Sequence, residues 1–509
     1  MRLCYARAAG AIGLVLSGCT VGPDYTGAPP AVIPAAYKEA AGAATVPGDG
    51  VWQPAHPGDA KERGRWWEIF GDPDLNALEE RVDRSNQTLK VADARFRQAR
   101  ALIGVPQSAL YPTLSFTPSA TYLKASGHQP GALVPNPKPT SEFELPFDLA
   151  YEIDFWGRIR RGVTAARDEA EASAADLATA KLALEAELAI DYIELRSADA
   201  QQKLLNDTVV TFTDALQLTQ DRLNGGAASD ADVAQAKAQL ETTRVQATDV
   251  AVARAAFEHA IAVLVGDPPA NFSVPPSPRE FTPPPVPPGL PSALLERRPD
   301  IAAAERRVAE ANEQIGIAEA AFYPTVTLSG TAGLVSTSLG NLFEGPSLAW
   351  AVGSELSQIL FDGGLRRAQS EASVANYEAL VAQYRQTTLT AFEEVEDNLA
   401  ALTILAREAL QQKDAVDAAA NSLRIFTNRY VGGVDAYLQV VTAQSVLLAN
   451  QRNTVDIVRR RMEADILLVK AIGGGWTITQ IPVLTETNPP PSPQPSPACG
   501  RGCRAERGG

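Results

Sequence analysis

The chain has 509 residues and a formal net charge of −15, so it can bury a large core, and its length alone suggests about three domains. An acidic chain without basic clusters is a poor partner for nucleic acid. The three histidines lie far apart, and the sequence contains no GxSxG, HExxH or phosphate-loop motif. We therefore expect no catalytic residue, no metal site and no enzymatic activity.

Residues 1–18 have the pattern of a lipoprotein signal peptide. Two arginines precede a short apolar stretch that cannot span a bilayer but matches the hydrophobic region of a secretory signal. The stretch ends in Leu-Ser-Gly-Cys, a bacterial lipobox, so we expect cleavage before Cys19 and a diacylglyceryl group on its thiol. This covalent lipid, with the palmitate typical of lipoproteins, is the only cofactor that we expect. The alternative is an ordinary signal peptide with an incidental cysteine. Thr20, in place of an aspartate, predicts sorting to the outer membrane.

The mature chain is predicted to consist of two related halves. Tyr-Pro-Thr occurs at 111–113 and again at 323–325, and Arg-x-x-Gly-Gly occurs at 222–226 and again at 429–433. These offsets define the expected organisation: an N-terminal segment (19–73), a first repeat (74–265), a proline-rich linker (266–298), a second repeat (299–476) and a disordered tail (477–509). The tail contains Cys499 and Cys503, whose role the sequence does not define.

Each half is expected to begin with a helical segment, at 74–110 and at 299–322. Two strands follow, and then a very long helix, a Gly-Gly turn and a returning helix. The long helices are predicted at about 158–223 and 365–430, and the returning helices at about 230–265 and 435–472. Roughly 60 residues at 1.5 Å each give a rod of about 90 Å. The apolar stripes of such rods must be covered by neighbouring helices, as in a coiled coil or a helical barrel.

Strands are predicted at about 113–124, 141–155, 325–336 and 347–360, and the first three alternate between apolar and polar residues. The polar face of the second strand carries five carboxylates: Glu142, Glu144, Asp148, Glu152 and Asp154. Two-faced strands of this length favour a transmembrane β-barrel, and the alternative is a half-buried strand in a soluble sandwich. Four strands cannot close a barrel, so copies of the chain must share one. The chain contains no apolar run long enough for a helical membrane span.

The sequence resembles the outer membrane factor family, the TolC-like exit ducts of tripartite export systems, in its NodT/OprM lipoprotein branch. The resemblance rests on "CTVGPDY" (19–25), "WWEIFGDPDLNAL" (66–78), "PGLPSALLERRPDIAAAE" (288–305), "AAFYPTVTLSG" (320–330) and "LFDGGLRRAQ" (360–369), together with the two Gly-Gly turns. It implies an α+β membrane protein. Three copies would form a twelve-stranded transmembrane β-barrel, continuous with a long periplasmic α-helical barrel and surrounded by a mixed equatorial domain.

The resemblance also places a gate and an adaptor-docking site at the periplasmic tip, where the Gly-Gly turns lie. The tip residues expected to take part are Arg222, Gly225, Gly226, Asp230, Asp232, Arg429, Tyr430, Gly432, Gly433, Asp435 and Leu438. Many relatives carry an acidic ring in the second hairpin, but here the matching positions hold Gln439 and Thr442. For each charged tip residue, the alternative is a solvated turn residue without a role in gating.

The expected function is therefore a passive outer membrane duct for multidrug or other small-solute efflux. Its expected partners are a periplasmic adaptor (membrane fusion) protein and an inner-membrane, proton-driven pump, with no nucleic acid. The strand carboxylates are expected to line the lumen and favour cations. Two alternatives remain open at this point. One is a lipid-anchored periplasmic coiled-coil scaffold that never spans the membrane, and the other is the duct of a protein-secretion or metal-efflux system. The sequence does not define the exported substrate.

Overall fold

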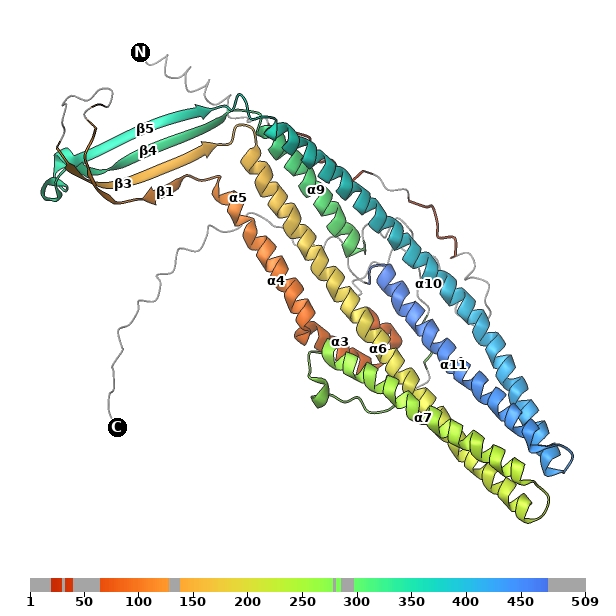
Figure 1. The fold of residues 1–509 in the computed structure, drawn as a ribbon. Coiled ribbons are helices and arrows are strands. Elements are labelled where there is room, and N and C mark those ends of the chain that lie inside the picture. Colours follow the sequence, from red (N-terminus) through yellow and green to blue (C-terminus); the bar gives the residue numbers. More distant parts are fainter. Residues whose placement is uncertain are drawn as a thin grey trace, which may run out of the picture.

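The computed structural model describes residues 20–29, 33–39, 65–126, 128, 138–277, 281–284 and 297–474. The predicted signal peptide, Cys19 and the tail with Cys499 and Cys503 lie outside these residues. The described chain forms an elongated molecule, with a β-sheet at one end and two helical hairpins that end together at the other (Figure 1). No helix among the described residues combines the length and the apolarity that a membrane crossing requires.

The two halves have matching helices. The long helices α6 (Arg158–Asn224) and α10 (Leu365–Val431) each contain 67 residues, or about 100 Å of rod, and the returning helices α7 (Asp230–Leu264) and α11 (Tyr437–Ala471) each contain 35. Each long helix begins directly after a glycine with positive φ, Gly157 or Gly364, where the chain turns sharply from strand to helix. Helix α9 (Pro299–Ala320) packs against both α6 and α10.

The segment predicted to be helical at 74–110 is helical, but it is not one continuous helix. It consists of α3 (Pro73–Ser85), α4 (Gln87–Leu102) and the short α5 (Gly104–Ser108). Asn86 leaves the helical conformation between α3 and α4, where its side-chain oxygen accepts the Leu89 N–H at 2.9 Å and caps α4. Its amide nitrogen donates to the Leu264 carbonyl at 2.8 Å, so the break also caps the C-terminus of α7.

In the second half, the C-terminus of the returning helix is capped in a similar way. Arg298, the residue before α9, donates to the Ala471 carbonyl at the end of α11 over 3.1 Å. The glycine that follows each returning helix, Gly266 or Gly473, has a positive φ and lies against the backbone of Ser85 or Arg297. These two junctions join each hairpin to the helix that begins its own half.

The sheet contains β1 (Thr113–Phe116), β2 (Ser119–Leu123), β3 (Thr140–Ile153), β4 (Thr325–Ser336) and β5 (Leu348–Ser357). All pairings are antiparallel, in the order β1–β3–β4–β5, with β2 also on β3. The single strand predicted at 113–124 is therefore interrupted. β1 and β2 pair with β3 in one continuous register that places residues 117 and 118 opposite 146 and 145. Pro118 and Pro146 have no N–H to donate, which explains the gap.

The register gives the sheet one apolar face and one polar face. Leu114, Leu149 and Gly330 stand side by side on the first face with Val352, while Ser115, Asp148 and Thr331 stand side by side on the second. The fourth strand, which alternates poorly in sequence, also follows this pattern: Leu348, Trp350, Val352 and Leu356 share the apolar face, opposite Ala349, Ala351 and Glu355. Trp350 is 74% exposed and Val352 is 79% exposed in the single chain, so the apolar face has no cover within it.

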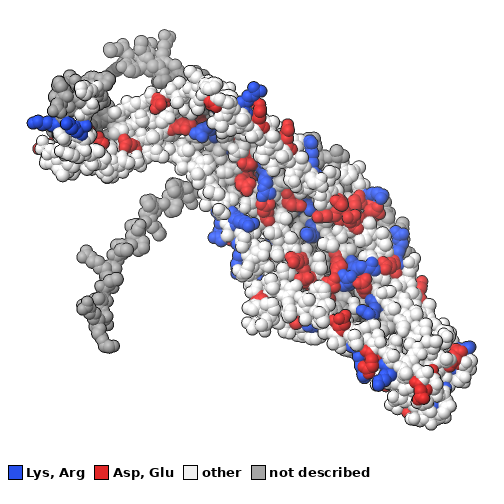
Figure 2. Space-filling model, in the orientation of Figure 1, with Lys and Arg blue, Asp and Glu red and all other residues white. Residues whose placement is uncertain are grey.

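The main hydrophobic core lies midway along the rods. It joins η1 (Trp66–Phe70) and α3 to the central parts of the long and returning helices. Among its largest fully buried side chains are Trp67, Leu75, Leu188, Tyr192, Ile193, Leu195, Ile261, Ile301 and Leu399. On the face drawn in Figure 2, charged residues of both signs are spread along the helices, while the sheet end is mostly uncharged. Within the described part of the proline-rich linker, η2 (Pro269–Asn271) is a short turn of 3-10 helix that begins at a proline.

Candidate functional site: the helical tip

The two Gly-Gly turns reverse the chain between the long and returning helices. Gly226 and Gly433 have φ values of +74° and +73°, and their preceding partners, Gly225 and Gly432, keep helical φ values. In the first turn the Ala227 N–H donates to the Arg222 carbonyl at 2.7 Å, and in the second the Val434 N–H donates to the Arg429 carbonyl at 2.9 Å. Only the second glycine of each pair therefore needs a left-handed backbone conformation. This conformation lets the N–H of the next residue donate a hydrogen bond to a carbonyl at the end of the long helix.

The two predicted acidic residues of the first turn lie at the start of α7. Asp232 forms a capping box with Ser229: its carboxylate accepts from the Ser229 N–H and hydroxyl, both at 2.9 Å, while the Ser229 hydroxyl accepts from the Asp232 N–H. Asp230 is exposed in the first turn of the same helix, where a negative charge is favourable. For both residues these contacts fit the alternative of a helix-terminal turn residue.

The second turn holds an ion pair. Arg429 donates from Nε and Nη2 to the two carboxylate oxygens of Asp435, at 2.6 Å and 2.9 Å. This fork geometry keeps the pKa of Asp435 below its ordinary value and raises that of Arg429. Nearby, Leu438 is 51% exposed, and Gln439 is exposed too. The Thr442 hydroxyl donates to the Leu438 carbonyl at 2.8 Å, within the turn of helix that precedes it.

The two hairpins meet through Arg222 and Tyr430, although these residues are more than 200 positions apart. The guanidinium carbon of Arg222 lies 4.7 Å from the centre of the Tyr430 ring, and Nη1 donates to the Val431 carbonyl at 3.0 Å. Tyr430 also faces Tyr437, with 5.1 Å between ring centroids. Tyr430 is therefore a buried contact between hairpins, not a residue that flanks its turn in solvent.

A small hydrophobic cluster surrounds this contact, and we call it the tip core. It consists of Ala236, Tyr430, Tyr437, Val440 and Val441, with Leu216, Leu423 and Phe426 packed at its edge. Apart from Tyr430, these residues are absent from the predicted site. The sequence pattern could have identified part of this cluster, because positions 437, 440, 441 and 444 have the spacing of one helix face. In the structure all four of these side chains are buried. A further polar contact between hairpins joins the Gln239 amide to the Ser445 hydroxyl at 3.1 Å.

The five strand carboxylates have different partners. Glu152 accepts two hydrogen bonds of 2.8 Å from Arg158, and Asp154 accepts from the Arg160 N–H at 2.9 Å. Further along the sheet, Asp148 accepts from the Thr331 hydroxyl at 2.7 Å and the Thr117 hydroxyl at 3.2 Å, and Glu144 accepts from the Ser119 hydroxyl. Glu142 is partly exposed on the same face, beside Thr121. Two of the five charges are thus paired with arginines where the sheet meets the helices.

The N-terminal segment lies at the junction of sheet and helices. The Val21 N–H donates to the Trp156 carbonyl at 3.1 Å, and Thr20 contacts Gly157, the glycine that begins α6. Further contacts join Gly22 to Arg161, Pro23 to Asn312 and Tyr25 to Glu305. The segment therefore begins where strand turns into helix and continues along α9. Among the described residues, no group of three or more His, Cys, Asp or Glu side chains could hold a metal ion.

The described chain thus joins a two-faced sheet to paired helical rods of about 100 Å. The family model of the outer membrane efflux protein matches residues 79–267 and again 290–474, so the chain belongs to this family, and the resemblance found in the sequence is confirmed. The two matched ranges overlap the two predicted halves, 74–265 and 299–476.

Individual relatives are similar over nearly the whole chain. The toluene efflux pump outer membrane protein TtgF of Pseudomonas putida is 34% identical over 94% of this chain and 98% of its own. The pyoverdine export outer membrane protein OpmQ of Pseudomonas aeruginosa is 31% identical over 82% of this chain and 89% of its own. The solved outer-membrane channel OprN superimposes with a TM-score of 0.81 at 30% identity, over 90% of this chain and all of that one.

These similarities confirm the predicted function and location. The chain is an outer membrane channel of a tripartite efflux system, located in the outer membrane and extending through the periplasm. The alternative of a periplasmic scaffold that never spans the membrane does not fit these relatives.

Proposed function

We propose that three copies of this chain form one passive duct, with four strand positions from each copy closing a twelve-stranded barrel. The observation that carries this proposal is the register of the sheet, which gathers large apolar side chains on one face and hydroxyls and carboxylates on the other. The apolar face suits lipid and the polar face suits a wet lumen. The β1/β2 and β5 edges are unpaired within the described chain, so each is available to a neighbouring copy.

The helices support the same assembly. Helices α6 and α10 present exposed apolar side chains along their length, including Val210, Leu218, Leu389, Ile404 and Leu410. A rod of this length needs neighbours to cover such residues, and helices from two other copies would provide them. The duct has no energy source of its own in this proposal. A periplasmic adaptor contacts the tip and an inner-membrane pump, which we take to be proton-driven, supplies the work.

The proposal predicts a cation-preferring channel of three chains. Native mass spectrometry of the purified protein should give a trimer, and reversal potentials in a salt gradient across a planar bilayer should show preference for cations. Glu144→Gln with Asp148→Asn should weaken that preference, because both carboxylates lie on the polar face without an arginine contact in the described structure. Glu144→Asp with Asp148→Glu is the matched control, since it changes the same two side chains and keeps both charges on the polar face. An anion-selective or unselective wild-type channel would contradict the lumen assignment.

The proposal places a lipid on Cys19. Thr20 contacts Gly157 at the junction of sheet and helix, and this position supports an anchor at the level of the inner leaflet of the outer membrane. Radiolabelled palmitate should therefore be incorporated into the wild type and not into Cys19→Ala. Cys4→Ala, which changes a cysteine of the predicted signal peptide, should keep the label. Equal labelling of Cys19→Ala would reject this site.

We propose small organic solutes as the substrate class. The relatives named above are described as exporting toluene and pyoverdine, which differ greatly in size and polarity. A duct that contacts its solutes loosely tolerates such variety, and selection among them then belongs to the pump. The contact of Arg222 with Tyr430 and Val431 is proposed to hold the tip closed at rest, and the pair of Arg429 and Asp435 to keep the second turn in shape.

A further inference from the structure

A second polar cluster lies far from the tip, where η1 and α3 pack against α6. Trp66 and Trp67 of η1 are almost fully buried there, at 2% and 1% exposed. Glu79 of α3 is completely buried, and Glu185 of α6 is 3% exposed. Two carboxyl groups therefore lie within one hydrophobic core. Full burial of a glutamate is rare unless its carboxyl group is paired with another group.

In this cluster the described residues give Glu185 a hydrogen-bond partner but give none to Glu79. The Trp66 indole N–H donates to one oxygen of Glu185 at 2.9 Å, and the Lys181 ammonium lies 3.6 Å from the other. Lys181 is closer to Asp83, at 2.8 Å. Neither oxygen of Glu79 has a hydrogen-bond partner among the described residues.

The charges acting on Glu79 come from the two elements packed around it. They are the carboxylates of Asp83 on its own helix and of Glu185 on α6, and the single cation Lys181 on α6. An ionised carboxylate buried without hydrogen bonds is very costly, and one ammonium cannot balance three carboxylates. Burial, followed by repulsion from Glu185 and Asp83, raises the pKa of Glu79 to about 10. Burial also raises the pKa of Glu185 to about 7, against the Trp66 hydrogen bond and the Lys181 charge.

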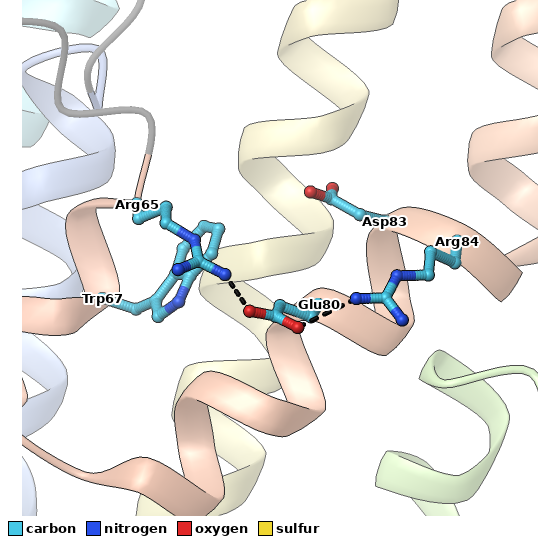
Figure 3. A pocket seen from close by; sticks show the side chains of 5 residues that line it. All are labelled: Arg65, Trp67, Glu80, Asp83 and Arg84. Atoms are coloured by element: carbon cyan, nitrogen blue, oxygen red, sulfur yellow. Dashed lines mark hydrogen bonds and ion pairs between the residues drawn. The ribbon is translucent and has the colours of Figure 1, made fainter.

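A hollow at the surface lies beside this cluster. Figure 3 shows a pocket of about 260 Å³ whose wall includes Asp83 and Trp67, with Arg65, Glu80 and Arg84 around it. Asp83 bonds to Lys181, and Lys181 approaches Glu185, so polar groups continue from the pocket to the buried carboxyls. The lysine side chain is 42% exposed, so it can exchange protons with water.

We propose that the junction of η1, α3 and α6 is a proton-binding site, in which Glu79 stays neutral in the folded protein at neutral pH and shares its environment with Glu185. The proton permits η1 to close over α6 with both carboxyls inside the core. Loss of the proton in alkali introduces a second negative charge beside Glu185 and opens this junction. The site therefore weakens the attachment of the η1 segment to the rods as pH rises.

The expected pH dependence has a defined sign. The folded protein holds the Glu79 proton up to about pH 10, while the unfolded chain releases it near the ordinary range of glutamate. Between these two pKa values the folded state binds more protons than the unfolded chain. The contribution of Glu79 to the free energy of unfolding is therefore fully present below the unfolded-state pKa and decreases as pH rises towards the folded-state pKa.

The test compares Glu79→Gln with Glu80→Gln in the full-length, detergent-solubilised protein. Glutamine has the shape of a protonated glutamate, so the first variant should keep the fold and lose the share of the pH dependence that Glu79 contributes. From about pH 6 to about pH 9 its unfolding temperature should fall by less than that of the wild type, and the remaining fall comes from other buried carboxyls such as Glu185 and Asp168. Glu80→Gln should follow the wild type, because Glu80 is a partly exposed neighbour that pairs with Arg65 and Arg84.

A direct measurement detects the proton itself. The infrared spectrum of the wild type at pH 8 should contain a carbonyl band of a protonated carboxyl group that is absent from Glu79→Gln and retained in Glu80→Gln. In Glu185→Gln the repulsion from Glu185 is lost, so the band should disappear at a lower pH than in the wild type. Burial, the largest cause of the raised Glu79 pKa, should still keep the band present at pH 8. Equal pH slopes for Glu79→Gln and wild type, or a wild-type spectrum without the band, would overturn the proposal.

Discussion

Arg222→Ala should open the channel more often in planar-bilayer recordings than the wild type does. The substitution removes the guanidinium from the face of Tyr430 and the hydrogen bond to the Val431 carbonyl. Together these contacts contribute about 1–2 kcal/mol in each copy. Because 1.4 kcal/mol is a factor of ten in an equilibrium, openings should become about tenfold more frequent or more, since each of the three copies in the proposed trimer loses the contact.

Two other variants make this experiment specific. Arg429→Ala breaks the ion pair with Asp435 inside the second turn, so we expect a smaller increase in opening. Arg244→Ala is the matched control, because this arginine pairs with Glu241 on its own helix and is exposed. If inserted, trimeric Arg222→Ala conducts like the wild type and like Arg244→Ala, the Arg222 contact does not hold the tip closed.

Gly473→Ala should greatly reduce the amount of folded protein. Gly473 has a φ of +89°, and an added Cβ would lie 2.2 Å from the Arg297 carbonyl oxygen, where the end of α11 meets the start of α9. The left-handed backbone costs about 1–2 kcal/mol for alanine, and the clash with rigid backbone adds to it, for a total of about 3 kcal/mol or more. Yield of protease-resistant protein and the unfolding temperature measure this loss.

The chain offers a control that separates the two costs. Gly226 has a φ of +74° and nothing within 4 Å of an added Cβ, so Gly226→Ala keeps the backbone strain without the clash. Gly266→Ala tests the equivalent junction of the first half, where the added Cβ would lie 2.7 Å from the Ser85 carbonyl oxygen. Equal losses for Gly473→Ala and Gly226→Ala would show that strain alone matters and that the junction has room to adjust.

Several elements could be predicted closely from sequence because their signals are local. The long helix expected at 158–223 spans Arg158–Asn224, and the strand expected at 325–336 has those bounds. In each case a run of helix-forming residues or strict alternation continues without interruption between turn residues. The tip turns were also recognisable, since two adjacent glycines interrupt each run.

The sequence by itself determined the order of the elements, the two faces of the strands and the positions of the turns, because residue periodicity and backbone preferences act within a few residues. Only the tertiary structure decided which distant groups meet. Pro118 faces the Pro146 region because of the pairing register, Tyr430 is covered by Arg222 because of the rotation of two helices, and Glu79 meets Glu185 inside one core. Register and helix rotation depend on contacts between residues that are far apart in the chain, so no local pattern specifies them.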